Sequence, residues 1–198
     1  MTEKRMTEPT VRDRILDTLL DLTADRGAEG VTVREVATAA GVSIGTVQYY
    51  CHSKEQMLTM AFDEVNRRII ARVNDIQQTG TVGAVLRRAL LEFLPLDAAR
   101  RREASVYLAF STRAVVLPAL AAIRHDLIAD QHRLCADAFR LAHERGETLA
   151  DVDPDSAAWT TVALIDGLLL NLLSDPTGLS ADDAIGVVDR HLGALTRI

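Results

Sequence analysis

Cysteines and aromatic residues are scarce in this chain of 198 residues. The two cysteines, Cys51 and Cys135, lie far apart and form no Cys-x-x-Cys motif. We therefore expect neither a disulfide framework nor a zinc ribbon, and reduced thiols fit a cytoplasmic protein best. Aromatic residues make up 4% of the chain, and the alternating apolar and polar runs that indicate strands are rare. With 48% hydrophobic residues, the composition favours an all-α fold with a sizeable core.

Long apolar runs and targeting segments are also lacking. Residues 1–9 are polar and have no apolar core of the kind found in signal peptides. The richest apolar run, Val162–Leu173, is interrupted by Asp166 and Asn171, so it falls short of the roughly 18 apolar residues that a membrane span needs. We expect a soluble protein with no membrane partner.

Positive charge is in deficit over the whole chain but not in every part of it. The formal net charge is -6, which argues against nonspecific coating of nucleic acid, because such binding needs many cations facing phosphates. Between Val36 and Lys54, however, there is no acidic residue. This acid-free window is a neutral-to-basic stretch inside an acidic protein.

Periodicity and capping signals predict helices throughout. Three short helices are expected over Thr10–Gly27, Thr32–Ala40 and Ser43–His52, each beginning at a hydroxyl residue that can accept from an orphan amide. The first should bury one apolar face, formed by Val11, Ile15, Leu19 and Leu22.

A capping box of Ser53 and Gln56 predicts a long fourth helix, whose apolar face carries Met57, Ala61, Phe62, Val65 and Ile69. Further helices are expected at 81–95, 99–114, 116–146, 154–174 and 180–197, punctuated by Pro95, Pro118, Pro154 and Pro176. The pattern predicts a small module at 10–53 joined to a larger body at 54–198.

The second and third helices, with a tight turn at Gly41, match a helix-turn-helix. The letters from Gly41 to Glu55, GVSIGTVQYYCHSKE, resemble the recognition helix of the TetR family and its link to the fourth helix, and the match extends over about residues 10–60. The Asp-Gly-Leu-Leu-Leu run from Asp166 looks like the dimerising helix of that family. The resemblance implies a dimeric regulator, most often a repressor, that binds a palindromic operator in double-stranded DNA and is released by a small-molecule effector.

Helical geometry alone, without the family resemblance, also predicts that one face of the third helix is exposed to read DNA. Val47 and Cys51, one turn apart, should pack inward with Val42, while Gly45, Thr46, Gln48, Tyr49 and His52 point outward. Gln48 can pair bidentately with adenine, and a methyl group of Ile44 or Thr46 can meet the thymine methyl.

By resemblance, Thr32, Tyr49, Tyr50 and Lys54 contact phosphates. The predicted DNA-binding set is Thr32, Ser43, Ile44, Gly45, Thr46, Gln48, Tyr49, Tyr50, His52 and Lys54. Gln48, Cys51 and His52 depart from the usual Tyr, Phe and basic residue of the family, so its operator sequences do not carry over.

No other motif carries chemistry. His132 and Cys135 stand one turn apart, but two ligands do not make a metal site, and the run Arg100–Arg102 is expected to be solvated surface. Gly-rich phosphate loops, nucleophile elbows and His-Glu-x-x-His are missing, so we expect no cofactor, no metal and no enzyme activity.

Two further interpretations concern the body. The segments 154–174 and 180–197 are expected to form a homodimer interface through Ala157, Ala158, Leu164, Ile165, Leu168, Leu169, Leu172, Ile185, Val188, Leu192 and Leu195. A ligand is expected to contact some of Phe62, Asn66, Phe93, Tyr107, Phe110, Arg113, Leu120 and Gln131. Both sets equally fit ordinary core residues, and a helical interaction scaffold, an activator without small-molecule induction or a helical enzyme without short motifs stay open as alternatives.

Overall fold

The computed structural model describes residues 10–27, 30–149, 151–175 and 177–198. Residues 1–9, predicted to form no signal peptide, and Pro176 lie outside these residues. Within them the chain forms α-helices joined by turns, which confirms the predicted all-α fold. The helices are α1 (Val11–Arg26), α2 (Val33–Ala40), α3 (Ile44–Tyr50), α4 (Lys54–Asn74), α5 (Val82–Leu91), α6 (Ala98–Ala114), α7 (Pro118–Glu144), α8 (Pro154–Ser174) and α9 (Ala181–Leu195).

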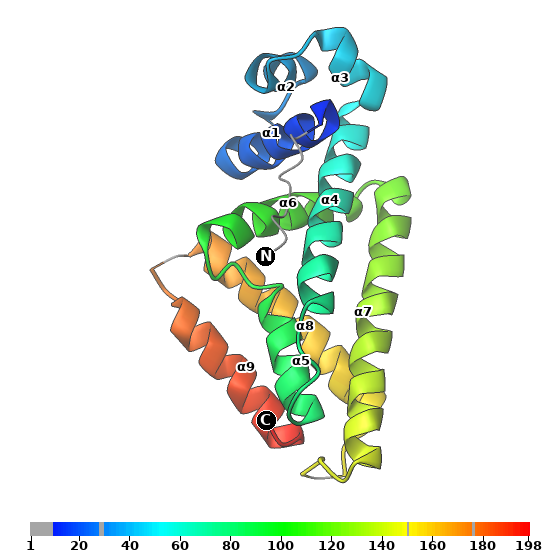
Figure 1. The fold of residues 1–198 in the computed structure, drawn as a ribbon, viewed down its shortest axis with the longest axis vertical. Coiled ribbons are helices and arrows are strands. Elements are labelled where there is room, and N and C mark those ends of the chain that lie inside the picture. The colour runs from blue at the N-terminus through cyan, green and yellow to red at the C-terminus, as the bar shows by residue number, and fades with distance from the viewer. Residues whose placement is uncertain (1–9, 28–29, 150, 176) are drawn as a thin grey trace, which may run out of the picture.

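These helices form two ends joined by two shared helices (Figure 1). The first three helices form one end, and α5, α7, α8 and α9 form the other. Helix α4 runs from one end into the other, and α6 lies across the middle, where it packs on both α1 and α4. The two ends therefore share the packing surfaces of α4 and α6.

The caps of α1 and α2 confirm the sequence prediction, whereas two details differ. The Ser53 hydroxyl accepts from the Gln56 amide at 3.2 Å, but the Gln56 side chain accepts from the His52 amide at 2.7 Å, so the predicted reciprocal box with Ser53 is wrong. In α1, Val11 is 37% exposed. The buried face of α1 consists instead of Ile15, Leu16, Leu19, Leu20 and Thr23.

The core beneath α1 to α3, called here the N-terminal core, extends beyond those helices. It also contains Met57, Ala61, Val65 and Ile69 of α4, and Val106 of α6. Val65 and Val106 are fully buried. The hydrophobic packing therefore crosses the boundary that the sequence predicts between residues 53 and 54.

The body core lies between α5, α6, α7, α8 and α9. Phe62 of α4 stacks on Phe110 of α6 at a centroid distance of 3.7 Å, and Leu94, Phe139 and Leu192 are almost fully buried in the same cluster. Aromatic stacking adds a geometric preference to the area buried here. This packing fixes the first half of α4 against α6.

Helix α8 is strongly apolar although Asp166 and Asn171 interrupt its longest apolar run. By length and a mean hydropathy of 1.5, it is apolar enough to cross a membrane. Packing accounts for this composition, because α8 contacts α6, α7 and α9 and sends Ala158, Ile165 and Leu172 into the body core. A helix in the core of a soluble protein can have the same length and mean hydropathy as a membrane-spanning helix.

The run Arg100–Arg102 is not plain solvated surface, contrary to the sequence prediction. Arg101 donates to the carbonyl oxygens of Leu172 at 3.0 Å and Leu173 at 3.3 Å. It thus supplies hydrogen bonds to backbone carbonyl groups at the C-terminal end of α8. Arg102 lies 3.2 Å from Asp21 of α1. The run therefore ties α6 to both ends of the molecule.

Candidate functional site

The turn between α2 and α3 has the geometry that a helix-turn-helix needs. Gly41 ends α2 in the left-handed conformation, with φ 65° and ψ 38°, which side chains with a Cβ rarely adopt. The Val42 amide then donates to Ala37 O at 3.0 Å, and the Ser43 hydroxyl caps α3 by accepting from the Thr46 amide at 3.0 Å. The two helices thus meet across one tight turn.

Helix α3 divides into a buried face and an exposed face. Val47, and Cys51 directly after the helix, have no exposed surface, whereas Tyr49 is 79% exposed and Ile44 is 42% exposed. Among the other residues predicted to face DNA, Gly45, Gln48 and His52 are exposed. Thr46, which was expected to point outward, is half-buried, as is Tyr50.

Tyr50 is partly buried against the N-terminal core. Its ring meets that of Tyr49 edge-on at 5.2 Å. The contact with Tyr50 therefore supports one side of the exposed Tyr49 ring.

Several hydroxyl and amide groups of this face are already hydrogen-bonded within the chain. The Ser43 and Thr46 hydroxyls lie 2.8 Å apart, and the Thr32 amide and hydroxyl donate to the Glu35 carboxylate at 3.0 and 2.9 Å. At the start of α4, hydrogen bonds with its own backbone and the Ser53 hydroxyl lower the pKa of Glu55. A phosphate at the start of α2 or α4 would have to compete with these carboxylates.

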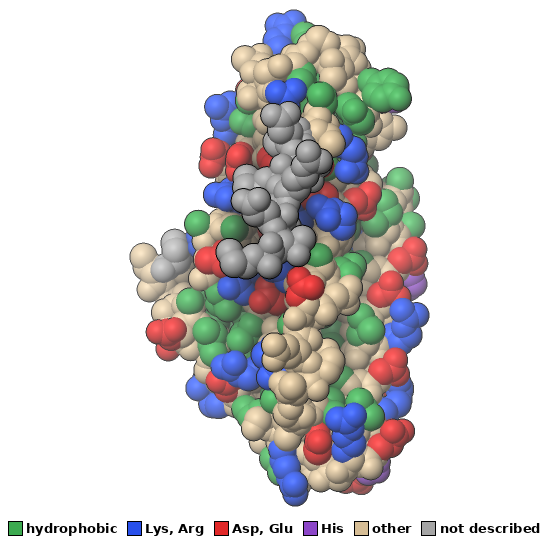
Figure 2. Space-filling view, in the orientation of Figure 1, with side chains coloured by type: hydrophobic (Ala, Val, Ile, Leu, Met, Phe, Trp, Pro, Cys, Tyr) green, Lys and Arg blue, Asp and Glu red, His purple; other side chains and the backbone are tan. Residues whose placement is uncertain are grey.

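Charge on this end agrees with the acid-free window. In Figure 2 Lys and Arg side chains lie at the tip of the molecule, while most acidic side chains visible on this face lie over α1 and the body. Lys54 begins α4 at the end of the acid-free window. No carboxylate within the window would therefore repel an anionic partner at α3.

Cys51 has a structural environment. Its thiol donates to Val47 O at 3.4 Å, and burial raises its pKa. A thiol with a raised pKa is a poor nucleophile at neutral pH.

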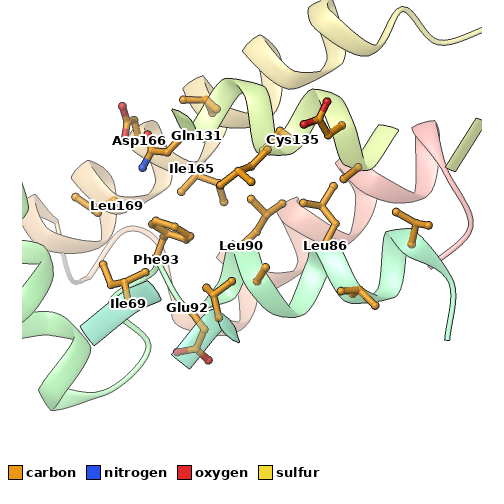
Figure 3. A pocket seen from close by; sticks show the side chains of 18 of the residues that line it. Ile69, Leu86, Leu90, Glu92, Phe93, Gln131, Cys135, Ile165, Asp166 and Leu169 are labelled. Carbon is orange, nitrogen blue, oxygen red and sulfur yellow. The ribbon is translucent and has the colours of Figure 1, made fainter. Parts of the chain in front are cut away.

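A second feature, called here the body cavity, lies between α4, α5, α6, α7 and α8 and has a volume of about 470 Å³. Figure 3 shows Leu86 and Leu90 on one wall, and Gln131 and Asp166 together at one end. The walls are mostly aliphatic, with Glu92, Glu103, Tyr107, Gln131 and Asp166 among the polar residues. A cavity of this size and lining suits a small organic molecule.

The structure brings some of the predicted ligand-binding residues to this cavity and not others. Phe93, Tyr107 and Gln131 line it. Phe62, Phe110 and Leu120 lie in the body core instead, Asn66 lies on α4, and Arg113 contacts Glu55 at 3.4 Å. The sequence pattern identifies apolar positions but cannot separate the wall of a cavity from filled core.

Sequence reasoning missed the ion network at the wall next to α4. Arg72 of α4 donates to Glu92 and to Glu103, each at a shortest distance of 2.7 Å, and Glu103 of α6 is 6% exposed. Removing one partner of such a buried pair leaves a charge without compensation. Because Arg72 and Glu103 lie far apart in sequence, no local spacing indicates this clamp between α4 and α6.

A polar cluster closes the end of the cavity at Asp166. The Tyr107 hydroxyl donates to Asp166 Oδ1 at 2.9 Å, and Arg124 Nη2 donates to Asp166 Oδ2 at 2.6 Å. Burial, and next the negative charge of Asp166, raises the pKa of Tyr107 well above its usual value, so it stays a hydroxyl. The Arg124 guanidinium lies 5.2 Å from the centre of the Tyr107 ring. The cluster pairs one carboxylate with one guanidinium, whose Nη1 is buried without a hydrogen-bond partner among the described residues.

The apolar residues assigned to a dimer interface are mostly core residues of the single chain. Except for Leu164, Ile185 and Leu195, which are half-buried, all are buried. For the buried residues, the prediction that they form the interface is therefore wrong, because they pack inside the single chain as the alternative interpretation expects. The outward side of α8 instead carries Trp159, Ala163 and Leu170, with Trp159 53% and Leu170 46% exposed.

The residues weighed as metal ligands have other contacts. His132 stacks on Trp159 at 4.2 Å, and burial raises the pKa of Cys135 to about 11. In the described part of the chain, no group of three or more His, Cys, Asp or Glu is placed to hold a metal ion.

Both ends of the chain match known protein families. Residues 15–60 match the family described as bacterial regulatory proteins, tetR family. Residues 83–197 match the BetI-type transcriptional repressor C-terminal family. The chain is 26% identical over 185 residues to the HTH-type transcriptional regulator PksA of Bacillus subtilis, covering 93% of this chain and 89% of PksA.

Solved structures of transcriptional regulators also resemble this chain. A transcriptional regulator from Rhodococcus sp. Rha1 superposes with a TM-score of 0.81 at 32% identity, covering 93% of this chain and 95% of that one. A regulator from Saccharomonospora viridis, in complex with choline, has a TM-score of 0.82 at 26% identity, covering 94% and 98%.

The tight turn, the exposed face of α3 and the helical body define a helix-turn-helix transcriptional regulator. The chain belongs to the TetR family and has a C-terminal part of the BetI type.

Proposed function

We propose that this protein acts as a cytoplasmic dimeric repressor, which binds a palindromic operator through α3 of each protomer and is released when a small molecule fills the body cavity. The observation that carries the proposal is the double role of α6. Its Glu103 and Tyr107 side chains line the cavity, while its Val106 side chain is buried in the N-terminal core. One short helix therefore contacts both the ligand compartment and the DNA-binding end.

Helix α4 makes the same connection. Met57, Ala61 and Ile69 pack in the N-terminal core. Ile69 also lines the cavity, together with Val73, which packs against the same core. A ligand that shifts α4 or α6 changes the position of α3 relative to the body. In a dimer, this changes the spacing of the two recognition helices. That spacing must match operator half-sites one helical turn apart.

Two features support a small organic effector. The cavity is lined mainly by aliphatic side chains, and the structural neighbour from Saccharomonospora viridis was crystallised with choline. The ligand must favour the arrangement that does not fit DNA, by a coupling free energy of about 1–3 kcal/mol.

The dimer is proposed to form through α8 and α9. The outward side of α8 exposes Trp159 and Leu170 and has small residues, Ala163 and Gly167, between them. Small residues let two helices approach closely, and two such pairs form a four-helix interface. An operator with two symmetric half-sites fits this two-fold symmetry.

A band-shift experiment with DNA from next to the gene tests the proposal. We expect a specific complex that bulk genomic DNA competes for poorly, and its loss when a ligand found in the purified protein by native mass spectrometry is added back. A protein that binds no DNA specifically would favour the alternative of a helical interaction scaffold. Specific binding that no ligand alters would favour regulation without small-molecule induction.

A further inference from the structure

The open side of the body cavity follows α7 and carries apolar side chains. Leu134, Ala138 and Leu141 lie on one face of this helix, about one turn apart, and all three line the cavity. Leu134 is nevertheless 65% exposed, and Leu141 is 39% exposed. Exposed apolar side chains that adjoin a cavity mark a surface that a ligand can cover. The apolar lining therefore extends from the body core out to solvent.

Arg145 lies at the end of this apolar face. It directly follows α7, one turn after Leu141, and also lines the cavity. Arg145 is exposed, and its guanidinium has no ion pair or hydrogen bond with any of the described residues. Gln131, at the other end of the cavity, lies fourteen residues earlier, which is about 21 Å along a helix. The cavity thus has a long apolar wall with an exposed cation at its open end.

The other charged side chains that line the cavity are already in ion pairs. These pairs, at shortest distances of 2.6–2.8 Å, are Glu92 and Glu103 with Arg72, Arg100 with Asp97, Asp137 with Arg140, and Asp166 with Arg124. A ligand charge placed among the buried pairs would have to compete with them and lose its own hydration. A negative charge beside Arg145 keeps its contact with water and faces a cation that is not already paired. The head group of a charged ligand is therefore accommodated most easily at Arg145.

We propose that the body cavity binds an amphipathic anion, whose apolar chain lies between α5 and α7 and whose carboxylate or phosphate group contacts Arg145. This ligand class rests on the proposed ligand control and specifies it further. Figure 3 shows the aliphatic wall that would hold the chain, with Leu86 and Leu90 of α5 across from Cys135 of α7. Such a ligand is opposite in charge to the choline in the Saccharomonospora viridis structure.

Three probes test the inference by isothermal titration calorimetry at pH 7 on the full chain without DNA. Octanoate and octylammonium share an eight-carbon chain and differ in the sign of their charge, and hexanoate is two methylenes shorter. We expect octanoate to bind about tenfold more tightly than octylammonium, because an exposed ion pair and the opposing repulsion each change affinity a few-fold. Hexanoate should bind about 15-fold more weakly than octanoate, because each buried methylene changes affinity roughly fourfold.

Arg145→Gln removes the charge at the open end and keeps a polar side chain there. We expect it to bring the affinities of octanoate and octylammonium within about twofold of each other, and to leave the ratio of octanoate to hexanoate unchanged. Arg133→Gln is the matched control. It changes the net charge equally on the same helix, but Arg133 is not among the residues that line the cavity and is paired with Asp130 at 2.8 Å. This control should keep the tenfold preference.

The inference is overturned if octylammonium binds as tightly as octanoate, if hexanoate binds as tightly as octanoate, or if no probe binds. It is also overturned if Arg145→Gln keeps the tenfold preference, or if Arg133→Gln removes it as well. Both substitutions are at exposed side chains, and the comparison of the probes on the unmodified protein needs neither variant.

Operator release is measured separately by band shift. Binding of octanoate with the expected preferences, but without operator release, would support the ligand class and count against the proposed ligand control. Operator release by a cationic molecule, with no binding of octanoate, would overturn the ligand class and leave the proposed ligand control in place.

Discussion

Gln48 and Lys54 occupy different parts of the DNA-binding end, and their substitution should have different effects. Gln48 is exposed on the reading face of α3, whereas Lys54 begins α4 at the edge of the module. We expect Gln48→Ala to change the base preference at one operator position, by about 1–3 kcal/mol, because a bidentate contact to one base pair is lost. Band-shift titration against a set of single-base operator variants measures this.

Lys54→Ala is the matched comparison at the same end. It should weaken binding to all operator variants alike and lower the salt dependence of binding, because a phosphate contact carries no sequence information. If both variants bind every operator as the unmodified protein does, α3 is not the reading helix.

His191 makes the stability of the body depend on pH. Burial lowers the pKa of His191, and its Nε2 lies 2.8 Å from the Thr161 hydroxyl of α8, which itself donates to Ala157 O. The folded state therefore disfavours the charged imidazole. Its contribution to stability is complete above the ordinary histidine pKa of about 6.5 and is lost as pH falls below it.

Urea unfolding at pH 8 and at pH 5.5 checks this expectation. The free energy of unfolding of the unmodified protein should fall more between these two values than that of His191→Gln, since the other histidines are common to both. Equal decreases would show that His191 does not contribute.

At the scale of elements, α8 presents two neighbouring leucines with opposite surroundings. Leu168 is 6% exposed and belongs to the body core, while Leu170 is 46% exposed on the outward side. We expect Leu170→Glu to give a folded monomer that binds the operator weakly, because a charge is placed in the dimer interface. Sedimentation measures the mass, and circular dichroism measures the helix content.

Leu168→Glu is the contrasting variant. It should lose helix content rather than only dissociate, because a buried carboxylate without a partner destabilises the core itself. An unmodified protein that sediments as a monomer at micromolar concentration would contradict the proposed dimer.

For the whole molecule, coupling between the two ends must be reciprocal. If a ligand in the body cavity weakens operator binding by some factor, the operator must weaken ligand binding by the same factor. We expect the affinity of any effector found to fall about 5- to 150-fold when saturating operator is present, which calorimetry on the complex measures. Equal affinities with and without operator would show that ligand binding does not control the DNA-bound state.

Local signals in the sequence predicted the helices well. Prolines, glycines and hydroxyl residues act within one turn of the chain, so the starts of α1, α2, α3 and α8 lie where their caps indicate. The predicted end at residue 95 differs, since α5 ends at Leu91 and a turn with Phe93 N donating to Leu90 O follows. Pro95 marks the limit of the helix but not its last residue.

The sequence by itself determined the helical class, the helix-turn-helix and the exposed face of α3, because these depend on neighbours three or four residues apart. Only the tertiary structure decided which apolar residues line a cavity, which fill the core and which face outward on α8. It also decided that Arg72 clamps Glu103, and that Tyr107 donates to Asp166. Those partners lie on different helices, so no spacing along the chain indicates contacts that only packing creates.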